Sequence, residues 1–104
     1  MFINLTPHTL NIHTPGDVIA IPPSGEVARV ATVSVETDPV GGIPTVKTTF
    51  GEVTGLPAPK EGVTLVVSGL VASAAPRYDV FSPGDLVRDA SGRPVGCQGL
   101  RRSI

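Results

Sequence analysis

Alternating apolar and polar residues, interrupted by Pro and Gly, form the main pattern along this chain. Segments 10–13, 26–36 and 43–50 alternate, whereas segment 18–21 is wholly apolar and segment 63–67 is apolar at nearly every position. Alternation with a period of two is typical of strands with one face in a core, and a continuous apolar run is typical of a strand buried on both faces. The chain is therefore predicted to be mostly all-β, a small β-barrel or β-sandwich of about eight short strands with one short helix.

The turn residues predict where the strands reverse direction. Thr14-Pro15-Gly16-Asp17 and Ser82-Pro83-Gly84-Asp85 share one turn chemistry. Pro presets the φ of the first central residue, and Gly accepts the positive φ that a type II turn requires at the second, so each segment is predicted to close a hairpin. The pair Gly41-Gly42 predicts a third reversal. Gly51 predicts a bulge after residues 43–50 of the next strand.

The single helix is predicted at the point where the hydrophobic period changes. Ser68 precedes an Ala-rich segment, 69–75, which ends ahead of a Pro. Ser is a favoured N-cap residue, and Pro cannot continue a helix, so a helix of about two turns is expected there. Leu70, Val71 and Ala74 are its predicted core stripe, because residues at this spacing share a helix face.

Two of the alternating segments also predict which side chains face the core. In segment 26–36 the odd-numbered residues are the more apolar set, so they are predicted to point inward, and Arg29 belongs to that row. An inward guanidinium needs a carboxylate, a carbonyl or a ligand, unless it lies at the sheet rim and reaches water. In segment 43–50 the even-numbered residues are the predicted core face, and Thr45, Lys47 and Thr49 are the predicted solvent face.

Length, charge and cysteine usage narrow the classes of function. The 104 residues predict a single β-rich domain, 1–104, and the net charge of −1 gives no basic stripe for a nucleic-acid polymer. Cys97 is the only cysteine, so no internal disulfide is expected. No apolar run approaches the about 20 residues of a membrane span, and no signal sequence is recognisable, so we expect a cytoplasmic protein without membrane contact.

Candidate catalytic groups are sparse. His8 and His13 are the only imidazoles, and their spacing along a strand places them on opposite faces, so no metal site or other cofactor is expected. A small hydrolase that uses Ser68 or Ser73 with His8 and Asp79 remains an alternative, although the sequence has no nucleophile-elbow motif.

A hairpin closed at residues 82–85 would bring charged side chains together at its open end. Arginine forks bind phosphate or carboxylate, and tyrosine can stack on a base, so a nucleotide-like small molecule is the expected ligand of such a cluster. The same charges could instead form an ion-pair network with no ligand. The predicted ligand-binding residues are Arg29, Arg77, Tyr78, Asp79, Arg88 and Asp89.

A series of short motifs resembles a group of small hypothetical proteins found in tailed phages, prophages and actinobacterial genomes. The motifs occur in order along nearly the whole chain: Asn4-Leu5-Thr6-Pro7-His8, Ile21-Pro22-Pro23-Ser24-Gly25, Ala28-Arg29, Thr48-Thr49-Phe50-Gly51, Gly55-Leu56-Pro57, Val66-Val67-Ser68, Asp79-Val80 and Arg88-Asp89. The resemblance implies no known activity or ligand. It does imply a phage-associated origin and an accessory role during infection.

Three functional hypotheses follow from these observations. The first is a binding protein that sequesters a nucleotide-type host immune signal. The second is a virion accessory or self-associating structural protein, because many short strands leave sheet edges that homo-oligomerisation would cover. The third is the small hydrolase.

Overall fold

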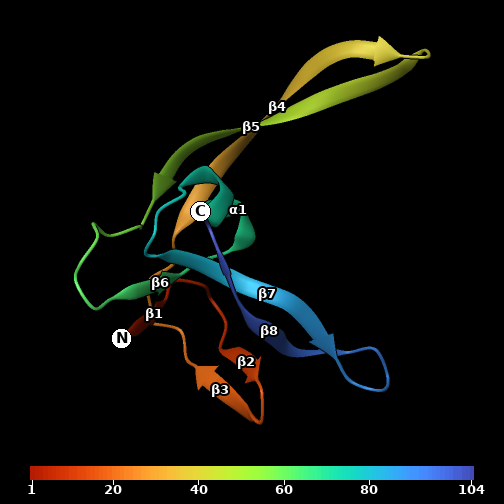
Figure 1. Cartoon of the computed structure of the whole chain (residues 1–104). Coiled ribbons are helices and arrows are strands. Elements are labelled where there is room, and N and C mark those ends of the chain that lie inside the picture. The colour runs from red at the N-terminus through yellow and green to blue at the C-terminus, as the bar shows by residue number, and fades with distance from the viewer.

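The computed structural model describes residues 1–104 as two β-sheets and one helix (Figure 1). The larger sheet has six strands in the order β1-β6-β7-β8-β2-β3 and curls into half of a barrel, and β4 pairs only with β5. The elements are β1 (Phe2–Asn4), β2 (Leu10–Thr14), β3 (Asp17–Ile21), β4 (Arg29–Val40), β5 (Ile43–Thr54), β6 (Thr64–Val66), α1 (Gly69–Ala74), β7 (Val80–Arg88) and β8 (Pro94–Arg102). The prediction of a mostly β protein with eight strands and one short helix is confirmed.

Strand β6 lies between β1 and β7 and is parallel to both. Leu65, Val66 and Val67 are fully buried, as a continuous apolar run predicts for a strand covered on both faces. The main core cluster gathers around this strand and consists of Leu5, Ala28, Leu65, Val67, Val71, Ala72 and Val80.

Helix α1 follows β6 directly and covers one face of the core. Ser68 is its N-cap as predicted, since its Oγ accepts a hydrogen bond of 3.3 Å from the backbone N–H of Val71. The predicted stripe is wrong at Leu70, which is 57% exposed, because the helix packs through Val71 and Ala72 instead. Helical spacing specifies which residues share a face, but the sheet decides which face is covered. This helix is not long and apolar enough to cross a membrane.

The N-terminal motif is held together by one buried amide. Asn4 Nδ2 donates to the carbonyl oxygens of His8 (2.8 Å) and Ile21 (3.0 Å). Its Oδ1 accepts from the backbone N–H (2.9 Å) and the hydroxyl (2.6 Å) of Thr6. The amide is therefore satisfied on both sides, as a buried polar group requires. The Asn-Leu-Thr-Pro-His motif thus has a structural role, because it joins the end of β1 to the end of β3.

Two of the three predicted reversals are confirmed. Gly16, with φ of 86°, lies in the tight turn between β2 and β3, and Gly41 and Gly42, with φ of 56° and 79°, connect β4 to β5. The predicted bulge at Gly51 is also confirmed, because the register between β4 and β5 shifts by one residue there.

The predicted hairpin at residues 82–85 is wrong. Residues Val80–Arg88 form one uninterrupted strand, β7, which pairs with β8 from Phe81 to Arg88. Gly84 does not adopt positive φ, and a Cβ built on it would lie 2.0 Å from the carbonyl oxygen of Gln98. Glycine is therefore required at this position by the close approach of β8 and not by a turn. The actual reversal follows at residues 89–93.

Strands β4 and β5 form a long hairpin, called the arm below, that projects from the six-stranded sheet (Figure 1). The arm gives the molecule extents of 51 × 40 × 23 Å and a radius of gyration of 16.3 Å, against roughly 13 Å for a compact domain of this length. Val30 and Val53 at its base pack against the main core cluster. Beyond the base no second sheet covers either face.

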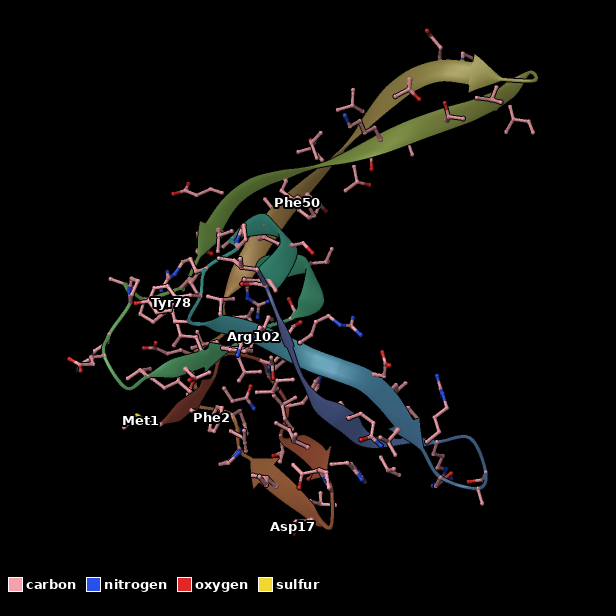
Figure 2. All side chains as sticks on the ribbon, in the orientation of Figure 1. Met1, Phe2, Asp17, Phe50, Tyr78 and Arg102 are labelled. Carbon is pink, nitrogen blue, oxygen red and sulfur yellow. The ribbon has the colours of Figure 1, made fainter.

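The predicted inward faces of these two strands are therefore wrong. Val33 and Val35 on β4 and Val46 and Phe50 on β5 are all exposed, whereas Thr45, predicted to face solvent, is partly buried. Figure 2 shows Phe50 on the arm, on the part nearer α1. Arg29 is exposed at the start of β4, as expected for a guanidinium that lies at the sheet rim and reaches water. Alternation specified two faces, but the fold leaves both of them in solvent.

Candidate functional site

The most buried charged contact of the molecule joins Arg77 to Asp79. Arg77 Nε donates to Asp79 Oδ1 over 3.0 Å, and its Nη2 donates to Oδ2 over 2.7 Å, so the contact is bidentate. The Asp79 side chain is 4% exposed. The hydrogen bonds from Arg77 hold the pKa of this carboxyl below its ordinary value, against the opposing effect of burial.

The remaining donors of Arg77 connect it to two other parts of the chain. Its Nη1 donates to the carbonyl oxygen of Pro57 over 3.1 Å, which ties the pair to loop 55–63. Its backbone N–H donates to Ser103 Oγ over 3.0 Å, and that hydroxyl donates back to the Arg77 carbonyl over 2.7 Å. The guanidinium is thus occupied by internal acceptors, and the pair acts as a tie between loop, strand and C-terminus.

The structure divides the six predicted ligand-binding residues among three places. Arg77, Tyr78 and Asp79 lie together before β7, and Arg88 and Asp89 lie at its other end, about 30 Å away for a strand of this length. Because residues 82–85 continue as strand, the ends of the expected hairpin never meet. Arg29 belongs to the base of the arm, so the six residues do not form the single cluster that a hairpin predicts.

The second group stabilises the turn between β7 and β8. Arg88 Nη1 donates to the carbonyl oxygen of Gly92 over 2.9 Å. Asp89 Oδ1 accepts from the backbone N–H groups of Ser91 and Arg93, both over 2.9 Å, and from the Ser91 hydroxyl over 2.8 Å. These bonds hold the pKa of Asp89 below its ordinary value, and the bond from the Ser91 side chain has the largest effect. The side chains of Arg88 and Asp89 therefore stabilise this turn.

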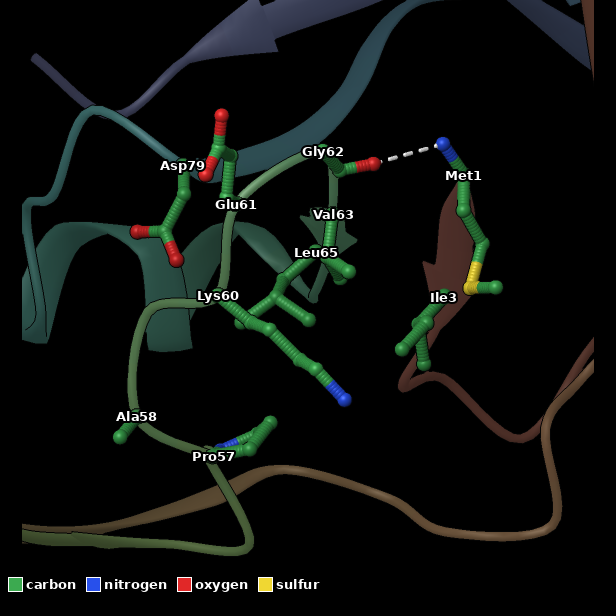
Figure 3. A pocket seen from close by; sticks show the side chains of 10 residues that line it. All are labelled: Met1, Ile3, Pro57, Ala58, Lys60, Glu61, Gly62, Val63, Leu65 and Asp79. Atoms are coloured by element: carbon green, nitrogen blue, oxygen red, sulfur yellow. Dashed lines mark hydrogen bonds between the residues drawn. The ribbon is translucent and has the colours of Figure 1, made fainter.

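Two hollows flank loop 55–63 next to Asp79. One, of about 340 Å³, is mainly apolar and includes Ile3 and Leu65, and the Lys60 side chain points across it (Figure 3). The other, of about 480 Å³, is lined in part by Lys60, Tyr78 and Phe81. Tyr78 is 75% exposed and available for stacking.

Three residues near Tyr78 were not predicted from the sequence. Lys60 and Phe81 line the same hollow as Tyr78, and Arg102 lies over the ring of Phe81. The guanidinium carbon of Arg102 lies 5.2 Å from the centre of the Phe81 ring, because β8 places it directly opposite Phe81. The sequence signal for this contact is indirect. Phe81 and Arg102 can be placed opposite each other only after residues 80–88 are recognised as one continuous strand.

Two of the groups considered for a hydrolase, Asp79 and Ser68, have other roles in the structure, and the only cysteine is not exposed. Asp79 is bound to Arg77, and Ser68 Oγ caps α1. Cys97 is buried, and its thiol lies 3.5 Å from the carbonyl oxygen of Gly99. No group of three or more His, Cys, Asp or Glu side chains is placed to hold a metal ion.

The largest unusual surface is the arm. Six apolar side chains on it are between 44% and 68% exposed, and they come from both strands and from both faces: Val33, Val35, Val40, Ile43, Val46 and Phe50. Exposed apolar side chains gathered on one projecting element are a common feature of interaction sites in folded proteins. No family model, curated protein or solved structure matches the chain, so function has to be argued from this geometry.

Proposed function

We propose that this protein is a self-associating structural protein and that the arm is the surface through which copies associate. The observation that carries the proposal is a hairpin of two twelve-residue strands whose faces are both uncovered beyond its base. A two-stranded hairpin alone in water is only marginally stable, and a third strand or a packed face is needed to hold it. A second copy can supply that cover.

The apolar residues of the arm give the association its driving force. Complete burial of a Val, Ile or Phe side chain is worth about 1.5–3 kcal/mol, so covering half-exposed side chains contributes about 1 kcal/mol each before the costs of ordering. With six such residues, the gain is enough to offset part of the entropy that association loses.

The resemblance to short phage proteins supports an accessory setting for this assembly, in the virion or during infection. If the protein is phage-encoded, it acts in the cytoplasm of the host cell. The structural role of the Asn4 network supports the same view, because the motif that carries much of the resemblance builds the fold and not a reactive site.

Sedimentation velocity over a dilution series tests the proposal. Wild-type protein is expected to form oligomers at micromolar concentration, and a variant with Val33→Ser, Val46→Ser and Phe50→Ser is expected to be monomeric. Val18→Ser, at an exposed valine on β3, is the matched control and should leave assembly unchanged. A strict monomer at every concentration would contradict the proposal.

A second candidate is ligand sequestration at the hollow of Tyr78, Phe81 and Lys60, as for a nucleotide-type host immune signal. Two aromatic rings and the Lys60 ammonium around about 480 Å³ favour it, because they can stack on a base and pair with a phosphate. Of the two carboxylates that also line this hollow, Asp79 is already paired with Arg77 and Glu61 is not. Mass spectrometry of purified protein should then detect a retained nucleotide. Tyr78→Ala and Lys60→Ala should release it, and Arg88→Ala, at the far end of β7, should not.

A further inference from the structure

The two faces of the arm carry opposite charge. The register pairs Glu36 with Val46 and Val35 with Lys47, and successive side chains of a strand point to opposite faces. The acidic face, as we call it, consists of Thr32, Ser34, Glu36, Val46, Thr48 and Phe50. The basic face consists of Val33, Val35, Thr37, Thr45, Lys47 and Thr49.

Each face also carries two exposed apolar side chains. Val46 and Phe50 belong to the acidic face, and Val33 and Val35 belong to the basic face. Any assembly that covers only one face leaves the other pair in water. The occupant must therefore offer apolar groups to both faces, together with a cation on one side and a carboxylate on the other.

We infer that successive copies of this chain stack arm on arm, with the acidic face of one copy on the basic face of the next. This inference rests on the proposed self-association and specifies its geometry. Glu36 and Lys47 belong to adjacent residue pairs, so they lie about 3.3 Å apart along the arm. The smallest extent of the molecule is 23 Å, so at the usual sheet spacing of about 10 Å successive arms must point in opposite directions to keep the bodies apart. In this antiparallel stack Glu36 of one copy lies within reach of Lys47 of the next.

A two-fold arrangement of like faces lacks this complementarity. Glu36 is the only charged group on the acidic face and Lys47 the only one on the basic face, so a like-face pair contains no opposite charges. It also leaves one apolar pair of each copy exposed. The other charged residues of the two strands, Arg29, Asp38 and Glu52, lie beyond the register shifts that bound segments 32–37 and 45–50.

The area of contact predicts how strong the assembly is. Six residues of a strand are about 20 Å long, and two strands with side chains span about 10 Å, so one face as defined above covers about 200 Å². Stable interfaces cover about 800 Å² on each partner, so a single arm contact is weak. Because unlike faces meet, the contact repeats from copy to copy and gives a ring or a filament whose size rises with concentration.

Charge reversal on the arm tests the stacking by sedimentation velocity. Glu36→Lys and Lys47→Glu alone are each expected to raise the concentration for half-assembly about tenfold or more, because like charges then meet in every contact. The double variant E36K/K47E is expected to assemble as the wild type does. An equimolar mixture of the two single variants should also assemble, since their arms alternate with opposite charges in contact.

Matched controls and the contrary outcomes separate this inference from the proposed function. Arg93→Glu and Glu26→Lys make the same charge changes at exposed residues away from the arm and should leave assembly unchanged. Assembly of the wild type that is insensitive to Lys47→Glu, or a mixture that stays monomeric, would overturn the stacking while self-association stands. A monomeric wild type would overturn both. Circular dichroism of each variant confirms that the fold is retained.

Discussion

Arg77 and Asp79 are joined by two hydrogen bonds. Arg77 Nε donates to Asp79 Oδ1 over 3.0 Å, and Nη2 donates to Oδ2 over 2.7 Å. A second ion pair, Arg101 with Asp85, has the same shortest distance of 2.7 Å, but its side chains are 62% and 85% exposed. The two pairs therefore differ in burial and in the number of hydrogen bonds, two against one. They provide an internal comparison of a buried bidentate ion pair with an exposed single contact.

Removing the guanidinium from each pair should have unequal effects on stability. Arg77→Ala should lower the free energy of unfolding by about 3 kcal/mol, because it leaves the buried Asp79 carboxylate without its partner. Arg101→Ala should cost less than about 1 kcal/mol, as exposed pairs do. Chemical denaturation measures both values, and equal losses would show that the Arg77–Asp79 tie is not a stabilising contact.

Acid should weaken the fold through the same carboxylate. The folded pKa of Asp79 lies below its ordinary value of 3.8, so the group contributes stability that is present above this value and is lost as pH falls through the folded pKa. Denaturation measured from about pH 5 to about pH 2 should show this loss. In Arg77→Ala the loss should be smaller, because the bonds that lower the pKa are gone. An unchanged acid profile in that variant would assign the pH dependence to other carboxylates.

Two leucines test the assignment of core and surface. Leu65→Ala should lower the free energy of unfolding by about 2–5 kcal/mol, because Leu65 is 1% exposed on the central strand β6. Leu70→Ala removes the same atoms from the exposed side of α1 and should cost less than about 0.5 kcal/mol. Thermal and chemical denaturation of both variants provide the comparison. A large loss at Leu70 would mean that this side chain is buried in an assembly.

Two glycines test whether residues 82–85 are strand or turn. Gly84→Ala should destabilise the protein by about 1–3 kcal/mol, because the added Cβ collides with the backbone of Gln98. Gly69→Ala is the control, since a Cβ there contacts nothing within 4 Å, and at the start of a helix it should be neutral or stabilising by up to about 1 kcal/mol. A tolerated Gly84→Ala would indicate that β8 does not pack closely on β7.

Much of the secondary structure follows from local chemistry. Ser68 caps α1, Gly16 and the Gly41-Gly42 pair reverse the chain, and Gly51 marks a bulge, all at the residues where sequence patterns predict them. These features depend on dihedral preferences and hydrogen bonds within a few residues. Such preferences belong to the residues themselves, whatever the rest of the fold does.

The error at Pro83-Gly84 shows where local chemistry stops being sufficient. The same Pro-Gly pair is a turn at residues 15–16 and part of a strand at residues 83–84. In the strand, Gly84 gives β8 room to approach, which is a contact with a segment more than ten residues away. Glycine thus serves either a turn or a close strand contact. Because residues 82–85 are strand, the residues of the predicted site lie at the two ends of β7 instead of together.

The sequence by itself determined that this protein is mostly β, with its helix after Ser68 and a buried strand at Leu65 to Val67, because alternation, capping and hydrophobicity act locally. Only the tertiary structure decided that Arg77 binds Asp79 while Arg88 lies far from both, and that the arm has no sheet against it. Alternation divides a strand into two faces, but what covers each face depends on distant segments. For the arm, whose two faces both carry apolar residues, no other segment of the chain supplies that cover.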